Sequence, residues 1–549
     1  MVSCLRPCFP RAAVGYNDWA MSTPKITASI QPCSPQGGFA NQPFTDFKLP
    51  ENARKMHTAL ELVASQLGRE YDLVIGGKRI KTKDKIRSIN PARPAQIVGI
   101  HQKAGAEHVE QVMATALSAF ESWSRTTVES RVSLLLNTAR ILRNRSFEFC
   151  AWLTFETGKN WAEADADVGE TIDFLEFYAR EALRLADSKT PIQYPGERCE
   201  LHYIPLGVGA VIPPWNFPFA IMAGMTAAAI VTGNTVILKP SSDAPTIAAK
   251  FMEVLEEAGM PAGVVNFCPG SGFTFGNAIV EHPKTRFISF TGSKKVGLEI
   301  HERAAKAKPN QIWLKRTILE MGGKDTILVC ADANLDAAVE GVVASTFGFS
   351  GQKCSACSRA ILEAPVYNSF IEKLLARVAK LTVGDPAANH NLGPVINKGA
   401  LDSILHYIEI GKKEGRLIAG GKAPEIDDGY FLEPTVFADI APDARLSQEE
   451  IFGPVLALIK VANFEEGMKV ANNTEYGLTG SIYSTDREKL NIARREFHVG
   501  NLYFNRKCTG AMVGAHPFGG FNMSGTDSKA GGPDYLLLFT QSKSVAEKL

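Results

Sequence analysis

Cysteine is scarce and scattered in this chain, at 10 of 549 residues. A small domain held together by disulfides would need a far higher density. Apart from the first 50 residues, only Cys354 and Cys357 lie close together in the sequence. The scatter therefore predicts a reducing compartment, in which most of the thiols are free and buried.

The chain also has almost no net charge. Its 59 lysines and arginines nearly balance its 58 aspartates and glutamates, which leaves a formal net charge of +1. Proteins that bind nucleic acid or an anionic membrane usually carry a basic excess. The overall charge thus predicts neither partner. Hydrophobic residues make up 45% and charged residues 21%, which excludes a largely disordered chain.

An uninterrupted apolar run long enough to cross a membrane is missing. Residues 203–238 contain no Asp, Glu, Lys or Arg, but Pro205, Pro213, Pro214 and Pro218 interrupt their first half. A spanning helix needs roughly 20 mostly apolar residues with intact backbone hydrogen bonds. This segment therefore predicts a buried strand, a loop and a helix, and no membrane partner.

The first 50 residues lack both a secretory signal and sustained periodicity. They are rich in Pro, Ser, Gly and Gln, and Met21 offers a second start. We expect residues 1–50 to form a disordered leader. Arg6 and Arg11 precede the first acidic residue, Asp18, so a mitochondrial presequence stays open as the alternative.

The next part of the chain predicts mainly helices. The segment YDLVIGGKRI (71–80) is typical of two strands joined by a Gly-Gly turn. Apolar periodicity predicts helices over residues 52–67, 104–123, 128–153 and 163–185.

From Ala210 onward, short apolar strands alternate with amphipathic helices, which predicts a parallel, doubly wound sheet. Strands are predicted within 234–240, 263–270, 286–290 and 317–323, and helices over 244–258, 277–281 and 294–305. A second alternating run occupies residues 326–504, and LLLF (536–539) is a candidate edge strand. Ligands of such sheets bind beyond the carboxyl ends of the strands.

Three features of the first alternating run are candidates for a dinucleotide site. A turn of small residues, Thr291 to Ser293, joins a strand to a helix and exposes backbone N–H groups, as a pyrophosphate site requires. Lys239 ends a strand and could reach ribose hydroxyls. The motif GSGFTFG (270–276) resembles a dinucleotide fingerprint with one residue too many. An ordinary turn and a solvated lysine remain the alternatives.

Cys354 lies in GQKCSACSR (351–359), after a Gly-Gln turn and beside Lys353. A nearby cation and local backbone dipoles can lower the pKa of a thiol and make it a nucleophile. A redox pair with Cys357, a zinc site and a buried structural thiol are the alternatives. No second C-x-x-C or histidine pair follows, so we expect no metal.

Glu320 and Asn216 are candidates for the remaining chemistry. Glu320 ends an apolar strand in LEMGGKD (319–325), and an apolar setting raises the pKa of a carboxyl enough for it to act as a base near neutral pH. Asn216 lies among prolines and aromatics in PPWNFPF (213–219), where a rigid amide could donate to an oxyanion. A salt-bridged strand end and a turn asparagine are the alternatives.

The motifs taken together resemble the aldehyde dehydrogenase superfamily over Asn52 to the end of the chain. They are PWNFP, KPSSDAP, FTGSKKVG, LEMGGKD, GQKCSACSR, EEIFGPV and HPFGGFNMSG, in this order. Three longer segments resemble the L-glutamate γ-semialdehyde (Δ1-pyrroline-5-carboxylate) dehydrogenase family. They are ADADVGETIDFLEFYAR (164–180), YFNRKCTGAMVGAHPFGG (503–520) and SGTDSKAGGPDYLLLF (524–539).

The resemblance implies an NAD-dependent oxidation of L-glutamate 5-semialdehyde to L-glutamate. Cys354 would be the nucleophile, Asn216 would hold the oxyanion, and Glu320 would activate the water that hydrolyses the thioester. The cofactor residues implied are Ile212, Pro214, Trp215, Lys239, Ser242, Gly272, Gly292, Ser293, Gly297, Glu450 and Phe452. Ser242 stands where NAD-preferring relatives often have a glutamate, so NADP stays open as the cofactor.

Substrate recognition is also implied by the resemblance. Ser355, Gly510 and Ala511 would bind the α-carboxylate, and Glu170 would meet the α-ammonium. Phe217 and Phe518 would pack on the methylene chain, and Lys353 would orient this region. For Glu170, a solvated helix face is the alternative.

The implied fold is α/β, with a Rossmann-type NAD-binding domain, an α/β catalytic domain and a small β oligomerisation element. The domains would be 51–186 with 205–319, then 320–522, and 187–204 with 523–549. We expect a homodimer or larger homo-oligomer in the cytoplasm, with the mitochondrial matrix as the alternative. The competing functions are oxidation of another aldehyde, a coenzyme-A-acylating reaction and a non-enzymatic binding role.

Overall fold

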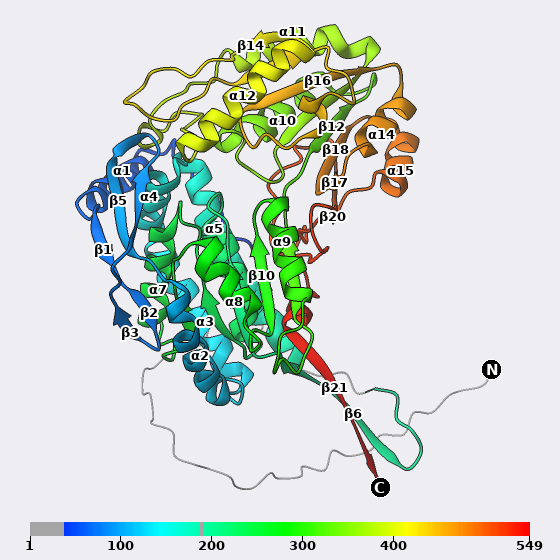
Figure 1. Cartoon of the computed structure of the whole chain (residues 1–549). Helices are drawn as coiled ribbons and strands as arrows, with labels where there is room; N and C mark the ends of the chain where they lie inside the picture. Colours follow the sequence, from blue (N-terminus) through cyan, green and yellow to red (C-terminus); the bar gives the residue numbers. More distant parts are fainter. Residues whose placement is uncertain (1–37, 187–190) are drawn as a thin grey trace, which may run out of the picture. The chain divides into compact units, whose positions relative to one another are not determined.

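A seven-stranded sheet organises the first part of the chain in the computed structural model, which describes residues 38–186 and 191–549 (Figure 1). Its order is β11-β10-β7-β8-β9-β2-β3, and the first five strands are parallel. The strands are β7 (Val208–Ile212), β8 (Thr235–Leu238), β9 (Val265–Phe267), β10 (Phe287–Thr291), β11 (Arg316–Glu320) and the antiparallel edge pair β2 (Leu73–Ile75) and β3 (Lys78–Ile80).

Helices cover this sheet, which explains why β7 to β10 are apolar and buried along their whole length. They are α1 (Pro50–Ala64), α2 (Val109–Trp123), α3 (Val128–Asn144), α4 (Ser146–Thr157), α5 (Trp161–Ala186), α6 (Ala220–Val231), α7 (Pro245–Glu257), α8 (Asn277–Glu281) and α9 (Lys294–Ala305), with short turns η1 (Ala106–His108) and η2 (Gly272–Gly276). The helix predicted over 128–153 is two helices, because Arg145 leaves the helical conformation between α3 and α4.

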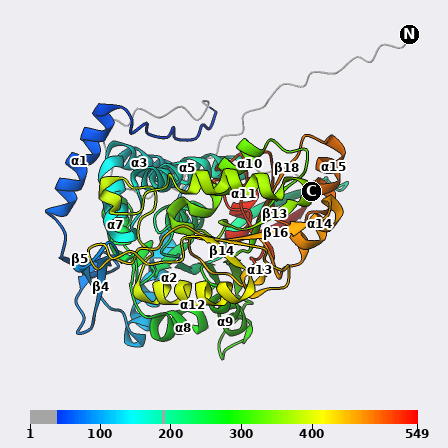
Figure 2. The ribbon, with the colours of Figure 1, turned by 90° about the horizontal axis from the view of Figure 1, so that it is seen from above.

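A second seven-stranded sheet has the order β14-β15-β16-β13-β12-β18-β19. Figure 2 shows α10 and α11 on one side of it and α12 on the other. Its strands are β12 (Asp325–Val329), β13 (Cys357–Glu363), β14 (Arg416–Ala419, antiparallel), β15 (Thr435–Ala438), β16 (Val455–Val461), β18 (Thr479–Tyr483) and β19 (Asn501–Phe504). Its helices are α10 (Leu335–Phe347), α11 (Tyr367–Val378), α12 (Lys398–Glu414), α13 (Arg445–Gln448), α14 (Phe464–Asn472) and α15 (Arg487–Glu496), with turns η3 (Gly348–Gly351), η4 (Ala364–Val366) and η5 (Pro386–Ala388).

Smaller strand pairs complete the fold. A three-stranded sheet that the sequence did not predict consists of β1 (Arg69–Tyr71), β4 (Lys85–Asn90) and β5 (Arg93–Gln102). The two-residue strands β17 (Tyr476–Gly477) and β20 (Phe521–Asn522) tie the chain after β19 back to the second sheet.

The last strand of the chain does not begin where the sequence suggested. The edge strand predicted at LLLF is wrong, because residues Tyr535–Phe539 form a 3₁₀ turn, η6, that buries Leu536 and Phe539. The strand β21 (Thr540–Lys548) follows and pairs antiparallel with β6 (Glu197–Pro205) as a two-stranded ribbon (Figure 1). A run of large apolar side chains needs burial, whereas the ribbon is mostly exposed.

Part of the expected leader is ordered on helix α5. The backbone N–H of Gln42 donates to Asp173 at 2.6 Å, and that of Thr45 donates to Asp165 at 2.7 Å. Phe39 packs edge-on against Phe177. The prediction of disorder up to residue 50 is therefore wrong for residues 39–49, because α5 presents carboxylates whose burial requires hydrogen-bond donors. Residues 1–37 lie outside the described residues.

The uncharged segment 203–238 forms the end of β6, strand β7, a loop, helix α6 and strand β8, which confirms the predicted buried strand, loop and helix. Within the described ranges, no helix is both long and apolar enough to cross a bilayer.

Candidate active site

Cys354 lies where two cavities meet. It follows η3, in which Phe349 and Ser350 have left-handed backbone angles (φ 51° and 53°) that turn the chain sharply before β13. One cavity, of about 580 Å³, lies at the carboxyl ends of the first sheet's strands and is called the sheet cleft below. The other, of about 530 Å³, is called the acidic cavity because Glu163, Asp165, Glu170, Asp173 and Glu320 line it.

The surroundings of Cys354 favour its neutral thiol over the thiolate. Burial raises its pKa well above the ordinary value, and the carboxyl groups of Asp325, Glu320 and Glu450 raise it further. The expectation that Lys353 lowers this pKa is wrong, because its ammonium is 2.7 Å from the carboxylate of Glu163. Deprotonation of Cys354 must therefore accompany its reaction.

Cys357 does not share the position of Cys354. It is buried in β13, lines neither cavity, and its Sγ lies 3.4 Å from the carbonyl oxygen of Arg359. This placement argues against a Cys354–Cys357 redox pair. No group of three or more His, Cys, Asp or Glu side chains suited to a metal occurs in the part of the chain that the structure describes.

Glu320 is placed by the end of β11, on the acidic cavity. Burial raises the pKa of its carboxyl to about 8, against the opposing effects of the Ser528 hydroxyl and of Lys529. Ser528 Oγ donates to Glu320 Oε1. The other oxygen, Oε2, is buried and accepts no hydrogen bond from any described residue. A carboxyl of this kind can exchange a proton near neutral pH.

Asn216 lines the sheet cleft with Cys354. One of its two amide N–H groups donates to the carbonyl oxygen of Gln352 at 3.1 Å, and the side chain is buried. This bond fixes the amide against the loop that carries Cys354. The second N–H can therefore serve an oxyanion formed at Cys354.

The sheet cleft has the donors that a dinucleotide needs. Lys239 is buried, its ammonium donates to the carbonyl oxygen of Pro240 at 3.0 Å, and burial lowers its pKa to about 8. The alternative for Lys239, a solvated strand end, is therefore wrong. The turn Thr291–Ser293 opens the twelve-residue helix α9, capped by Ser293 Oγ, which accepts from Val296 N–H. Backbone N–H groups here can face phosphate.

Other predicted cofactor residues also line the sheet cleft, with one exception. Gly297 is buried and does not itself line the cleft, and a Cβ added there would lie 2.4 Å from Met321 Sδ. This glycine lets α9 pack closely against Met321, which does line the cleft, and its place near the cofactor stays a prediction. The predicted residues that do line the cleft are Ile212, Pro214, Trp215, Asn216, Lys239, Ser242, Gly272, Gly292, Ser293, Glu450 and Phe452.

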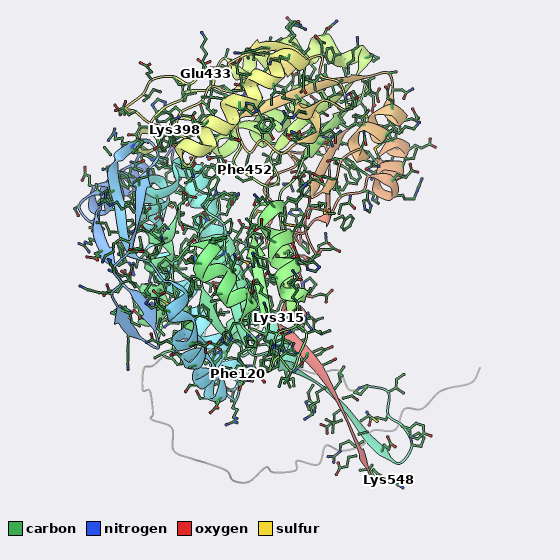
Figure 3. The ribbon with its side chains drawn as sticks, in the orientation of Figure 1. Phe120, Lys315, Lys398, Glu433, Phe452 and Lys548 are labelled. Carbon is green, nitrogen blue, oxygen red and sulfur yellow. The ribbon has the colours of Figure 1, made fainter. Side chains whose placement is uncertain are left out.

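Glu450 and Phe452 come from the loop after α13 and close the cleft from the second sheet, and Figure 3 labels Phe452 there. Glu450 Oε1 accepts from the N–H of Gly323 at 3.1 Å. A Cβ at Gly322 would fall 2.2 Å from the Glu450 carboxylate, so this glycine permits the approach. The rings of Phe452 and Trp215 meet edge to face at 5.5 Å.

All seven predicted substrate residues line the acidic cavity: Glu170, Phe217, Lys353, Ser355, Gly510, Ala511 and Phe518. Gly510 was expected to permit close approach, and it also has a left-handed backbone (φ 73°) that favours glycine. The side chain of Glu170 lies on the cavity wall, so the solvated helix face is wrong for it.

The acidic residues of α5 differ in their partners. Residues 163, 167, 170 and 173 recur at helical spacing and face one side. Glu163 pairs with Lys353, Asp167 lies 3.3 Å from Lys159, and Asp173 accepts from Asn41. No described residue donates a hydrogen bond to Glu170, and burial, aided by Asp167, raises the pKa of its carboxyl to about 8.

Four residues near the site were missed. Arg506 donates to the carbonyl oxygens of Thr509 and Gly510 and shapes that loop. Lys159 is buried with its ammonium 3.8 Å from the ring centre of Phe217. Asp243 lines the sheet cleft, and Ser528 contacts Glu320. A lysine in an apolar segment was the available signal for Lys159, whereas the others depend on tertiary contacts.

Comparisons with known proteins identify the family and several relatives of this chain. The aldehyde dehydrogenase family model matches residues 79–545. A 1-pyrroline-5-carboxylate dehydrogenase from Geobacillus thermodenitrificans is 58% identical over 510 residues, which are 93% of this chain and 99% of the relative. A protein of the same name from Bacillus mycoides is 54% identical with the same coverage. The solved 1-pyrroline-5-carboxylate dehydrogenase from Thermus with bound NAD is 51% identical, with a TM-score of 0.92, and the match covers 93% of this chain and 99% of that one.

Proposed function

This chain belongs to the aldehyde dehydrogenase family, and on that premise we propose that it oxidises L-glutamate γ-semialdehyde, the open form of 1-pyrroline-5-carboxylate, to L-glutamate with NAD. This would be the second step of proline degradation. The observation that carries the proposal is the position of Cys354 at the meeting point of the two cavities. The names of the relatives at 54–58% identity support the choice of substrate.

In this proposal Cys354 attacks the aldehyde carbon. Its sulfur forms a bond to that carbon while the thiol proton passes to a solvent water molecule, and the carbonyl oxygen becomes an oxyanion. The free amide N–H of Asn216 and the backbone N–H of Cys354 hold this oxyanion. A rigid donor costs no reorganisation when the charge develops, and the Gln352 contact makes the Asn216 amide rigid.

The chemistry that NAD would supply when bound in the sheet cleft is that of a hydride acceptor for the former aldehyde carbon. Lys239, the turn Gly292–Ser293 and Glu450 would hold it, and the buried ammonium and the N-terminus of α9 fit its ribose and phosphate groups. Ser242 is exposed on the cleft and Asp243 lies beside it. The Asp243 carboxylate supports NAD over NADP, because it would disfavour a 2′-phosphate.

Glu320 completes the reaction by taking a proton from water. The water oxygen then attacks the thioester carbon, the carbon–sulfur bond breaks, and glutamate leaves with a new carboxylate. This role of Glu320 favours hydrolysis over transfer to coenzyme A. Cys354 lines both cavities, while Asn216 lines the sheet cleft and Glu320 lines the acidic cavity.

The acidic cavity suits a substrate with both an α-carboxylate and an α-ammonium. Ser355 and the N–H groups of Gly510 and Ala511 would bind the carboxylate. Glu170 would bind the ammonium, because its carboxyl has no donor among the described residues, whereas neighbouring acids are paired. An arriving ammonium would lower the pKa of Glu170 and ionise it. Phe217 and Phe518 would cover the methylene groups.

We further infer that residues 51–186 with 205–319 form the cofactor domain and residues 320–522 the catalytic domain. The β6–β21 ribbon, within 187–204 and 523–549, would join a neighbouring copy in a homodimer or larger assembly, because its outer edges are paired with no further strand among the described residues. The free thiols of the described residues support the cytoplasm as its compartment.

The test follows the absorbance of the reduced nicotinamide. Purified protein is mixed with 1-pyrroline-5-carboxylate or a simple aliphatic aldehyde, each with NAD and with NADP, beside a Cys354→Ala control. The expected result is turnover of 1-pyrroline-5-carboxylate with NAD that the control lacks. Turnover of the simple aldehyde alone would leave the cysteine chemistry standing and contradict the substrate, and this is the second candidate function.

A further inference from the structure

A loop near the end of the chain is attached to the strand that carries Glu320. Thr526 N–H donates to the carbonyl oxygen of Leu319 at 2.9 Å, and Leu319 N–H donates to Thr526 Oγ1 at 3.0 Å. Met321 N–H donates to the carbonyl oxygen of Ser524 at 2.8 Å. These three bonds flank Glu320 on both sides, so the loop 524–529 keeps a fixed position over its carboxyl.

Ser528 is the residue of this loop that touches the carboxyl. It is buried, at 4% exposure, and its hydroxyl donates to Glu320 Oε1. The neighbouring ammonium of Lys529 is committed elsewhere, to the carbonyl oxygens of Gly500 and Gly519 at 2.8 Å each. The hydroxyl of Ser528 is thus the direct side-chain donor to Glu320 among the described residues.

The two oxygens of Glu320 consequently differ. Oε1 is held by Ser528, while Oε2 is buried without a donor among the described residues. We propose that Ser528 is a positioning residue that fixes Oε1, so that Oε2 is presented as the atom that takes the proton of the hydrolytic water. The inference rests on the proposed function, because it assigns a partner to the base of that reaction.

The hydroxyl also affects the charge of the base. Burial raises the pKa of Glu320 to about 8, while the Ser528 bond and the charge of Lys529 lower it and Asp527 raises it. Two other titratable groups face this carboxyl, the thiol of Cys354 and the phenol of Tyr535, and burial raises the pKa of both. Both stay neutral near pH 7. Removal of the Ser528 hydroxyl would therefore raise the pKa of Glu320 further and reduce its ionised fraction.

The experiment separates thioester hydrolysis from hydride transfer. Rapid mixing of enzyme, NAD and 1-pyrroline-5-carboxylate gives a first turnover of reduced nicotinamide, followed by a steady rate once hydrolysis limits. Ser528→Ala is expected to keep the first turnover and to lower the hydrolysis rate at pH 7 about tenfold, the equivalent of one hydrogen bond to a charged group. The acid limb of the pH profile is expected to move to higher pH.

Three variants control the result. Ser528→Thr keeps a hydroxyl donor, so its pH profile of hydrolysis should match that of the parent. Ser528→Cys has a weaker donor, so its acid limb should lie between those of the parent and of Ser528→Ala. Ser524→Ala removes another hydroxyl of the same loop. That hydroxyl accepts from Gly477 N–H and does not contact Glu320, so the acid limb of this variant should coincide with that of the parent enzyme. The cysteine variant tests the idea if the alanine variant does not fold.

An acid limb of Ser528→Ala that coincides with the parent's would overturn the inference. A shift in Ser524→Ala equal to that in Ser528→Ala would overturn it too, because loosening of the loop would then suffice. A parent enzyme that produces no reduced nicotinamide from 1-pyrroline-5-carboxylate would contradict the proposed function instead. The same rapid-mixing series with a simple aldehyde would then still decide the role of Ser528.

Discussion

Glu320→Gln should make the protein more stable and less active, and the gain in stability should depend on pH. Glutamine has the shape of the neutral carboxyl but never ionises. The pKa of Glu320 is raised from 4.5 to about 8 in the folded protein. A raised carboxyl pKa means that the folded state resists ionisation, so the parent loses stability as the pH rises above 4.5 and the loss levels off near 8.

The size of the effect follows from the shift. Each pKa unit corresponds to about 1.4 kcal/mol, so the parent's penalty is roughly 3 kcal/mol at pH 7 and roughly 5 kcal/mol above pH 8. These figures are upper values for the gain in stability of the variant. The Ser528 hydroxyl donates to Glu320 in the parent, and its contact with a glutamine amide is less favourable than its contact with a carboxylate. At pH 4.5 and below, the two proteins should be nearly equal in stability.

The assay is thermal unfolding of parent and variant at one scan rate, at intervals from pH 5 to pH 9, because unfolding of a chain of this size is usually irreversible and depends on scan rate. The midpoint difference should grow from near zero to its full value over this interval. Steady turnover should fall about 100-fold or more in the variant, while the first turnover of reduced nicotinamide persists. A midpoint difference that is constant over the whole pH range would refute the reasoning, since it would show that Glu320 ionises in the folded protein as readily as in the unfolded one.

Other predictions concern the cofactor, the fold and the ordered leader segment. Ser242→Glu should raise the preference for NAD over NADP about tenfold or more, measured as the ratio of the two kcat/KM values, because a carboxylate there would bind the ribose 2′-hydroxyl. Gly297→Val should lower the thermal midpoint and weaken NAD binding in a fluorescence titration, because the new side chain would collide with Met321. Asp165→Asn should cost about 1–2 kcal/mol of stability, measured by urea unfolding, because the amide is uncharged and leaves a single acceptor oxygen for the two donors of Thr45.

Much of the fold could be predicted from the sequence because its elements are strongly periodic. Helix α9 covers Lys294–Ala305, as predicted, and strands β8 and β10 lie within a residue or two of the predicted ranges. The failures have a common physical cause. The run Tyr535–Phe539 has strand-forming residues, but its burial against Phe287 decides its conformation. The break at Arg145 and the order of residues 39–49 likewise depend on partners distant in the sequence.

The candidate site also has features that the sequence predicted and features that depend on tertiary contacts. Cys354, Asn216 and Glu320 were identified through motifs, and the structure brings all three to the two cavities. Their electrostatic environment could not be predicted from adjacency in the sequence. Lys353 is next to Cys354 in the chain, yet its charge neutralises Glu163 on α5. Gly297 belongs to a cofactor motif, yet it serves the packing of α9 on Met321.

The two acids with a pKa near 8 explain how one cavity can serve both recognition and catalysis. Glu170 and Glu320 both line the acidic cavity, and each lacks a cationic partner within hydrogen-bond distance among the described residues. Desolvation raises the pKa of each carboxyl to about 8, which favours the neutral form near pH 7. An ammonium bound at Glu170 supplies the charge that ionises it, and a substrate without that group leaves it neutral. Glu320 receives no such cation and depends on the Ser528 hydroxyl and on pH. Glu170, which binds the substrate, is therefore ionised by the substrate itself. Glu320, which takes the proton from water, keeps a pKa close to the working pH, and this is the condition for efficient proton transfer.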